Sequence, residues 1–263
     1  MSPVSPVSPT ITPMPQALGA VVTGLPETFD GAVAAQLNDA WMRHQVLFFP
    51  QAHLDDERLI ALGSLFGNLA ATSPGRADDH RQQTVLGAHG EILEIDADRE
   101  RANAWHTDVT WAETPPTGAL LSMRTCPERG GDTMWLDQYR AYETLSEPVR
   151  TLVDGLRAVH GRPPSTGEHT HPAVITHPVT GRRALFVNRG WTTRFEGMSS
   201  IESTGLLRML CDHAERPENT VRWTWTPGDA ALWDNRCTQH YAVNDYGTAK
   251  RVLHRVTIFA PAA

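Results

Sequence analysis

The feature that most limits the fold of this 263-residue chain is a series of short segments rich in β-branched, aliphatic and aromatic residues. Glycine, proline and small polar residues separate these segments from one another. Segments of this length, closed by turn residues, predict β-strands. The predicted strands are 17–24, 46–49, 84–95, 104–111, 118–126, 184–188, 220–225, 229–235 and 251–259. This many short strands indicates a β-sandwich or an open β-barrel.

Four amphipathic segments predict helices that cover the strands. Apolar residues recur at three- and four-residue intervals in 31–45, 54–68, 138–157 and 200–215, and Ser146-Glu147-Pro148 predicts a break in the third. Strands with a few covering helices place the chain in the α+β class. Residues 160–180 are rich in glycine, proline, threonine and histidine and predict a loop. The Ser-Pro-Val repeats predict a flexible tail over 1–13, followed by one domain over 14–263.

The net charge of −7 favours a small-molecule partner, because nucleic acids and anionic membranes attract a basic surface. No apolar run approaches the ~20 residues that cross a bilayer. The N-terminus lacks the pattern of a signal peptide. The three cysteines, Cys126, Cys211 and Cys237, have neither the number nor the spacing of a disulfide framework or a zinc knuckle. These features predict a cytoplasmic protein with free thiols.

Two histidines and one aspartate form the first candidate site. His106 and Asp108 lie two residues apart in the predicted strand 104–111, so their side chains would point to one face. Such a pair also occurs as a partly exposed histidine beside a solvated carboxylate, so it is a weak indication alone. His240 follows the predicted strand 229–235, and two histidines plus a carboxylate match the facial triad that binds Fe(II) and leaves positions open. A structural zinc site would need four protein ligands.

The segment RVLHRVTIF (251–259) places two arginines on a largely apolar strand. Alternation puts Arg251 and Arg255 on the same face. Burying an unpaired guanidinium is unfavourable, and carboxylates and sulfonates are its natural partners. The two arginines therefore predict two anions. Thr133, in GGDTMW, has a hydroxyl that can support a carboxylate, although Gly-Gly-Asp-Thr is also an ordinary turn sequence.

In order and spacing, the segments WHTDVTW, GGDTMW, HPVTGRRALFVNRGW, LWDNRCTQHYAV and RVLHRVTI resemble the taurine dioxygenase family of Fe(II)/2-oxoglutarate-dependent oxygenases. The resemblance covers the chain from about residue 17 to 260. It implies a double-stranded β-helix, or jelly roll, with flanking helices. The catalytic iron ligands that it implies are His106, Asp108 and His240. It also implies that Thr133 and Arg251 bind 2-oxoglutarate, that Arg255 faces the anionic end of the prime substrate, and that O2 is consumed with release of succinate and CO2.

The chain departs from this family around the prime substrate. The region before HPVTG is shorter than the lid of taurine dioxygenases, and Ala102 stands where an asparagine would contact the amine of taurine. The segment FGNLAATSPGR (66–76) lacks the matching histidine. These departures predict a bulkier or more apolar anion, namely an alkyl or aryl sulfonate, a sulfate ester or an aryloxyalkanoate, with C–S or C–O cleavage after hydroxylation. The residues predicted to contact it are Val109, Trp111, Trp191 and Arg255.

Other interpretations remain open from the sequence. The same scaffold can hydroxylate an amino-acid-like or secondary-metabolite carboxylate. The triad can hold zinc in a hydrolase, which would leave Arg251 without a role. A non-catalytic anion-binding protein would retain the arginines. A second metal could bind the histidines of the predicted 160–180 loop, which are His160, His169, His171 and His177. The resemblance also implies a homo-oligomer, either a dimer or a tetramer.

Overall fold

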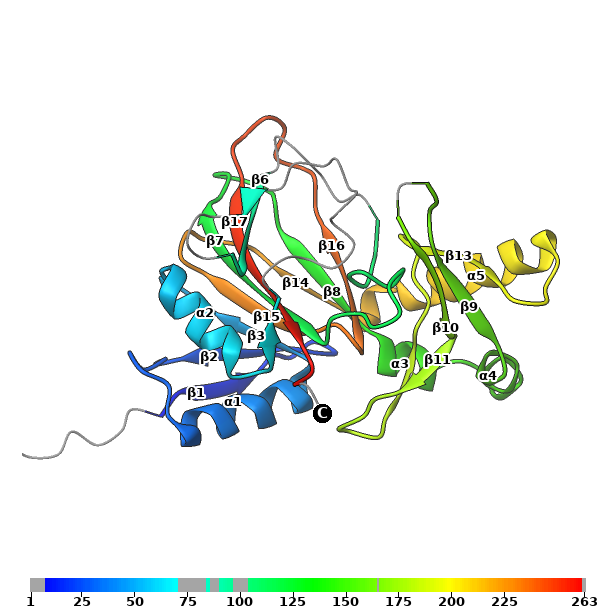
Figure 1. The fold of residues 1–263 in the computed structure, drawn as a ribbon, viewed down its shortest axis with the longest axis horizontal. Helices are drawn as coiled ribbons and strands as arrows, with labels where there is room; N and C mark the ends of the chain where they lie inside the picture. The colour runs from blue at the N-terminus through cyan, green and yellow to red at the C-terminus, as the bar shows by residue number, and fades with distance from the viewer. Residues whose placement is uncertain (1–7, 71–83, 86–89, 97–103, 165, 262–263) are drawn as a thin grey trace, which may run out of the picture.

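A large, mostly antiparallel sheet runs through the centre of the computed structural model, which describes residues 8–70, 84–85, 90–96, 104–164 and 166–261 (Figure 1). Its strand order is β1-β2-β3-β15-β7-β17-β6-β5, with β4 paired to β17, and only β2 and β3 pair in parallel. The strands are β1 (Thr10–Pro13), β2 (Ala20–Thr23), β3 (Val46–Phe49), β4 (Asn68–Leu69), β5 (Thr84–Val85), β6 (Ile92–Asp96), β7 (Gly118–Thr125), β15 (Ala230–Asp234) and β17 (Val252–Phe259).

The central strands β3, β7 and β15 are buried on both faces, which explains why they are mostly apolar rather than alternating with polar residues. Helices α1 (Gly31–His44) and α2 (Asp56–Ser64) cover one face (Figure 1). Leu47 and Phe49 of β3 belong to the core beneath these helices, while Val46 and Phe48 belong to the core on the opposite face. Each helix begins at an aspartate, Asp30 or Asp55, whose side chain accepts a main-chain N–H of the first turn.

A second sheet covers the opposite face. Its order is β14-β8-β16, and its strands are β14 (Thr220–Trp223), β8 (Thr133–Asp137) and β16 (Thr238–Ala242). The space between the two sheets holds large aromatic side chains, with Phe48 stacked on Trp223 at a centroid distance of 4.5 Å. Trp135 and Trp233 are fully buried there. This mixed arrangement of sheets and helices confirms the predicted α+β class.

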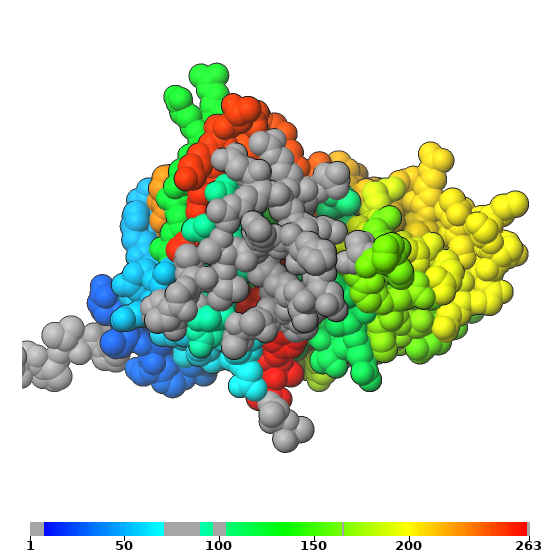
Figure 2. All heavy atoms as spheres, turned by 45° about the horizontal axis from the view of Figure 1, so that its top comes forward, coloured from blue at the N-terminus to red at the C-terminus, as the bar shows by residue number. Residues whose placement is uncertain are grey.

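The remaining elements form a lobe beside the two sheets, which projects on the right in Figure 2. We call it the side lobe. It contains α3 (Gln138–Glu143), α4 (Glu147–Asp154), β9 (Arg157–Gly161), β10 (Glu168–Pro172), β11 (Val174–Thr176), β12 (Arg183–Leu185), β13 (Thr192–Phe195) and α5 (Ser200–Ala214). The predicted break is present, because α3 ends at Glu143 and α4 begins after its N-cap Ser146 with Pro148 in the first turn. A capping box between Ser199 and Glu202 starts α5.

Three predictions about local structure are wrong. Residues 10–13, predicted as part of a flexible tail, form β1 and pair with β2. Residues 104–111 are a loop with turns rather than a strand, and their one ladder contact is an isolated bridge between His106 and His240. Residues 160–180 are not a loop, because β10 pairs with β9 and β11 pairs with β12. β10, with the sequence EHTHP, and the three-residue β11 are too polar or too short to show strand periodicity in the sequence.

Candidate metal centre

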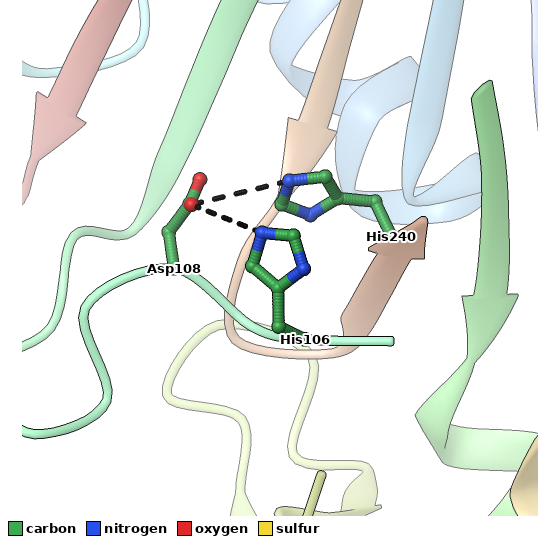
Figure 3. A group of neighbouring side chains, drawn as sticks. All are labelled: His106, Asp108 and His240. Carbon is green, nitrogen blue, oxygen red and sulfur yellow. Dashed lines mark ion pairs between the residues drawn. The ribbon is translucent and has the colours of Figure 1, made fainter. Parts of the chain in front are cut away.

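The predicted triad comes together in the structure. His106 and Asp108 lie on the 104–111 loop, and His240 lies on β16 (Figure 3). The Nε2 atoms of His106 and His240 lie 3.8 and 3.9 Å from the same carboxylate oxygen, Oδ1 of Asp108. The isolated bridge fixes the two histidines together, because the main-chain N–H of each donates to the carbonyl of the other at 3.1 and 2.8 Å. One backbone contact therefore joins two segments separated by more than 130 residues.

The chemistry of the three donors fits Fe(II). Nδ1 of His106 lies 2.9 Å from the Ala104 carbonyl, so Nδ1 carries the proton and the Nε2 lone pair faces Asp108. Burial lowers the pKa of His240 to about 3, which keeps its imidazole neutral at physiological pH. Two imidazole nitrogens and one carboxylate on one side of an ion would leave room for further ligands on the other. Among the described residues, the group that could hold an ion here has three members and not the four of a structural zinc site.

Arg255 of β17 contacts the carboxylate of the triad. Its Nη1 lies 3.3 Å from both carboxylate oxygens of Asp108. Burial by itself would raise the pKa of Asp108, but Arg255, through its charge and its hydrogen bond, and the neighbouring imidazoles of His240 and His106 together outweigh burial, and the pKa is lowered to about 2. Asp108 is therefore an anion across the physiological range. Within the described part of the chain, the buried Nε of Arg255 has no hydrogen-bond acceptor.

Arg251, just before β17, is buried without a carboxylate. Its Nε donates to the Gly131 carbonyl at 2.9 Å, and its Nη2 donates to Oγ1 of Thr133 at 3.2 Å. No acidic side chain of the described residues lies within ion-pair distance of its guanidinium, although buried cations are normally paired. Gly131 permits this close approach, because a Cβ at that position would lie 3.2 Å from the arginine Cδ. The arrangement leaves a buried positive charge that an anion can neutralise.

The hydroxyl of Thr133 is oriented by its neighbours. Oγ1 accepts one hydrogen bond from Arg251 and another, at 2.9 Å, from Nε1 of Trp225. A hydroxyl has two acceptor positions and one proton, so both acceptor positions of Thr133 are filled. Its proton must therefore point toward another acceptor. The hydroxyl of Thr133 and the guanidinium of Arg251 are therefore neighbouring hydrogen-bond donors, and both can donate to one carboxylate.

Three of the residues predicted to contact the prime substrate, Val109, Trp111 and Trp191, lie on or against the loop that carries Asp108. Trp111 and Trp191 meet edge to face with ring centroids 4.2 Å apart. Val109 is buried and has a φ of 56°, a left-handed conformation that costs a β-branched residue about 1–2 kcal/mol. Gly190, beside Trp191, brings the side lobe against the centre, since a Cβ there would lie 2.8 Å from that of His106. Ala102, which stands where the family has an asparagine, lies outside the described residues, as does most of 66–76.

The 106–112 segment is held by residues to which the sequence analysis gave no role at this centre. Asn235 bonds the backbone of Asp108, and Nε2 of His171 lies 2.9 and 3.1 Å from the carbonyls of Thr110 and Ala112. Nδ1 of His160 lies 3.0 Å from Oγ1 of Thr110. Asn235 is the last residue of the predicted strand 229–235, and a polar amide at the end of a buried strand could have indicated it. The partners of His160 and His171 lie 50 to 61 residues away, and no local pattern indicated them.

The predicted second metal site is not present among the described residues. His160 and His171 lie in β9 and β10, while His177 belongs to a separate buried group with Asp234 and Cys237. Nδ1 of His177 accepts two main-chain N–H groups, so its Nε2 carries the proton and donates to Asp234 at 3.0 Å. Arg236 donates to both oxygens of the same carboxylate. These atoms already satisfy one another, and the group is a structural network.

Comparisons with known proteins agree with this geometry. The family model described as "Taurine catabolism dioxygenase TauD, TfdA family" matches residues 10–257. An alpha-ketoglutarate-dependent sulfate ester dioxygenase from Pseudomonas putida is 38% identical over 94% of this chain and 88% of its own length. An (S)-phenoxypropionate/alpha-ketoglutarate dioxygenase from Sphingobium herbicidovorans is 32% identical over 92% of each. Alpha-ketoglutarate is another name for 2-oxoglutarate.

Solved structures give the same result. The crystal structure of a taurine dioxygenase from Burkholderia xenovorans has a TM-score of 0.87 and 36% identity, with 96% of this chain and 90% of that chain covered.

Among the residues described here, no helix combines the length and the apolar character needed to cross a bilayer.

Proposed function

Because the chain belongs to the taurine catabolism dioxygenase TauD, TfdA family, we propose that it hydroxylates a small organic anion at the expense of 2-oxoglutarate and O2. It is an Fe(II)/2-oxoglutarate-dependent dioxygenase, and its co-substrate leaves as succinate and CO2. We also propose that the large sheet and the β14-β8-β16 sheet are the two halves of a double-stranded β-helix. In this proposal the chain from β1 onward forms one catalytic domain.

The proposed iron ligands are His106, Asp108 and His240. Bound Fe(II) supplies the oxygen activation that replaces a substrate C–H bond with C–OH. The protein contributes a carboxylate whose pKa is lowered, the imidazole of His106 oriented by the Ala104 carbonyl, and the buried imidazole of His240, which together would hold a divalent ion. The side facing away from the triad is then available to the co-substrate and O2. The side chains between the sheets exclude bulk water from this region.

The observation that carries the proposal is the buried guanidinium of Arg251, which has no acidic partner among the described residues. Its cost is offset when a carboxylate binds, and the oriented hydroxyl of Thr133 adds a second donor to the same anion. A dicarboxylate would pair one end with Arg251 and bind with its other end to an ion held by the triad. The unpaired Arg251 therefore supports 2-oxoglutarate as the molecule bound between Arg251 and the triad. A zinc hydrolase with the same ligands would give Arg251 no role.

The proposed prime substrate is an alkyl or aryl sulfonate, a sulfate ester or an aryloxyalkanoate. Arg255 offers a cation, and Trp111, Trp191 and Val109 offer an apolar wall. The sulfate ester and phenoxypropionate dioxygenases among the relatives support an anion attached to an apolar group. Hydroxylation of the carbon that bears the sulfate, sulfonate or aryloxy group gives an adduct that collapses to a carbonyl compound. The C–O or C–S bond breaks in that step, and sulfate, sulfite or a phenol leaves.

The test is an anaerobic titration followed by a substrate panel. The wild-type protein should give the visible charge-transfer band of an Fe(II)/2-oxo acid chelate, and one class of anion should perturb that band and release one succinate per turnover. Arg251→Met should raise the KM for 2-oxoglutarate about 100-fold, because loss of one partner from a buried charged pair costs several kcal/mol. Arg183→Met, which removes an exposed pair with Asp154, is the control.

Each rival function has its own outcome in this test. Succinate release with taurine alone would exclude the bulkier anions, and release with amino-acid-like carboxylates alone would favour the alternative hydroxylase. Binding of anions without any succinate would indicate a non-catalytic anion-binding protein. We further propose a homo-oligomer, which light scattering can count, and a cytoplasmic location, which the free cysteines Cys126, Cys211 and Cys237 support.

A further inference from the structure

The carboxylate ligand of the candidate centre lies on a loop rather than on a strand. Asp108 follows the isolated bridge at His106 and has no ladder partner among the described residues. A loop alone does not hold a side chain to the few tenths of an ångström that a metal ligand needs. Other contacts must therefore fix the backbone of Asp108.

One side chain makes those contacts. Oδ1 of Asn235 accepts the main-chain N–H of Asp108 at 2.9 Å, and Nδ2 of Asn235 donates to the carbonyl of the same residue at 3.0 Å. The second Nδ2 hydrogen donates to the Pro116 carbonyl, also at 3.0 Å. The asparagine thus replaces a neighbouring strand for a single residue, since it pairs with both the donor and the acceptor of Asp108.

Asn235 is itself held rigidly. It is 1% exposed, it lies in the turn between β15 and β16, and its main-chain N–H donates to the Thr117 carbonyl at 3.0 Å. The same turn leads into β16, which carries His240. Next to Asp108, Oγ1 of Thr107 donates to the Thr238 carbonyl at 3.1 Å. Two of the three triad residues, Asp108 and His240, are therefore positioned by the same turn between β15 and β16.

The conformation after Asp108 also depends on this support. Val109 occupies the left-handed region, which a β-branched residue rarely adopts without outside contacts. With Asp108 pinned on both sides of its Cα atom, the chain reverses at Val109 and its backbone carbonyl accepts from Ala112 at 3.1 Å. Loss of the asparagine contacts would let the loop relax and would turn the carboxylate away from the two imidazoles.

We propose that Asn235 is a positioning residue that sets the orientation of the Asp108 carboxylate and thereby the affinity of the centre for a divalent ion. This inference rests on the proposed role of Asp108 as a metal ligand. Asn235 touches neither the ion nor a substrate, and it acts through the main chain of Asp108. Partners that orient metal ligands in this way typically contribute about 10–100-fold in metal affinity.

The test measures binding of Mn²⁺ to the full chain by calorimetry, with no turnover involved. Asn235→Asp keeps the acceptor for the Asp108 N–H and loses both donors, so it should weaken Mn²⁺ binding about 10–100-fold. It should also reduce the rise in Tm that saturating Mn²⁺ produces. Asn219→Ala is the matched control, because Asn219 is also buried and its amide donates to two carbonyls at the end of α5, far from the loop. This control should lower Tm and keep the wild-type affinity.

Asn235→Ser provides a milder variant if Asn235→Asp does not fold, and hydrogen exchange of the 106–112 amides should accelerate in it relative to Asn219→Ala. Wild-type Mn²⁺ affinity in a folded Asn235 variant would overturn the inference. An equal loss of affinity in Asn219→Ala would overturn it too, because the effect would then be general destabilisation. If the wild-type protein binds no Mn²⁺, or if His240→Ala binds as well as wild type, the proposed function fails together with the inference.

Discussion

The segment from His106 to Ala112 has two ends that are held by different parts of the molecule. The ligand end, residues 106–108, is bound to the turn and strand at 235–240, within the two central sheets. The wall end, residues 109–112, is bound to His160 and His171 of the side lobe. The proposed metal ligands and the proposed substrate contacts therefore have separate supports, although their residues are adjacent in the chain.

The chemistry of the two supports also differs. Amide and main-chain groups hold the ligand end, and their hydrogen bonding does not change with pH. Imidazoles hold the wall end, and burial lowers the pKa of both His160 and His171, so they act as neutral partners. Substitutions in the side lobe should therefore change the conformation of residues 109–112 without changing the metal affinity of the triad. Four measurements test whether the two ends of the segment are supported independently.

The largest effect is expected from Asp108→Ala at the ligand end. The variant loses one of three proposed ligands and leaves Arg255 without its carboxylate, so turnover should fall at least about 10³-fold. Mn²⁺ binding should be lost while the thermal unfolding transition remains cooperative. Asp154→Ala, which removes an exposed partner of Arg183, should keep normal turnover. Retained Mn²⁺ affinity in Asp108→Ala would contradict the assignment of the ligand end.

The next effect is expected from His171→Asn at the wall end. The shorter side chain loses its contacts to the Thr110 and Ala112 carbonyls, which should raise the KM for the bulky prime substrate about tenfold. The affinity for Mn²⁺ and the KM for 2-oxoglutarate should stay within a factor of about two. His213→Asn removes a comparable contact to the Ala141 carbonyl elsewhere in the side lobe and serves as the control. A parallel loss of Mn²⁺ affinity in His171→Asn would show that the two ends are not separate.

Acid should weaken the wall end through His160. Burial lowers the pKa of His160 from 6.5 to about 3, so between these values the unfolded chain binds a proton that the folded chain does not. Stability is therefore complete above pH 6.5 and falls as the pH drops toward 3. His160 should lower the free energy of unfolding by about 1.4 kcal/mol for each unit by which the pH falls below 6. Urea titrations at several pH values should show a slope for His160→Gln that is smaller by this amount, and equal slopes would contradict the prediction.

The smallest effect is expected outside both ends, at Trp225. Trp225→Phe removes the N–H that donates to Thr133, which frees one acceptor position of the hydroxyl. The KM for 2-oxoglutarate should rise about fivefold, in line with the loss of one buried hydrogen bond. Trp223→Phe, which loses a bond to Asp229, is the control. A change in Mn²⁺ affinity or in the KM for the prime substrate would show that the co-substrate pocket is coupled to the loop.

Much of the fold could be predicted from the sequence because its signals are local. The segment VLFF gave the buried strand β3 over the predicted residues 46–49, and helical periodicity gave α1 and α5 within a residue or two. On β17, Leu253 lies in the core between the sheets, while Val256 and Ile258 lie beneath the helices, which confirms the predicted alternation. β10, with the sequence EHTHP, carries almost no such signal and was missed.

The candidate site was predictable for a different reason. Spacing and family resemblance indicated His106, Asp108 and His240, and the structure brings these side chains together. The predicted reason why His106 and Asp108 lie together was wrong, because a distant asparagine holds Asp108 and strand alternation does not. Asn235, His160 and His171 act across 50 to 127 residues of chain. Pairings over such distances depend on the three-dimensional packing, which no local pattern in a single sequence encodes.

The contact between Arg255 and Asp108 bears on the order of assembly. A carboxylate buried alone would have to wait for an ion before the chain could fold, since an unmatched buried charge is strongly unfavourable. Here the guanidinium already serves as its counter-ion at 3.3 Å. We therefore expect the polypeptide to reach its native state first and to load iron afterwards, so that chelation and reconstitution leave the folded protein intact.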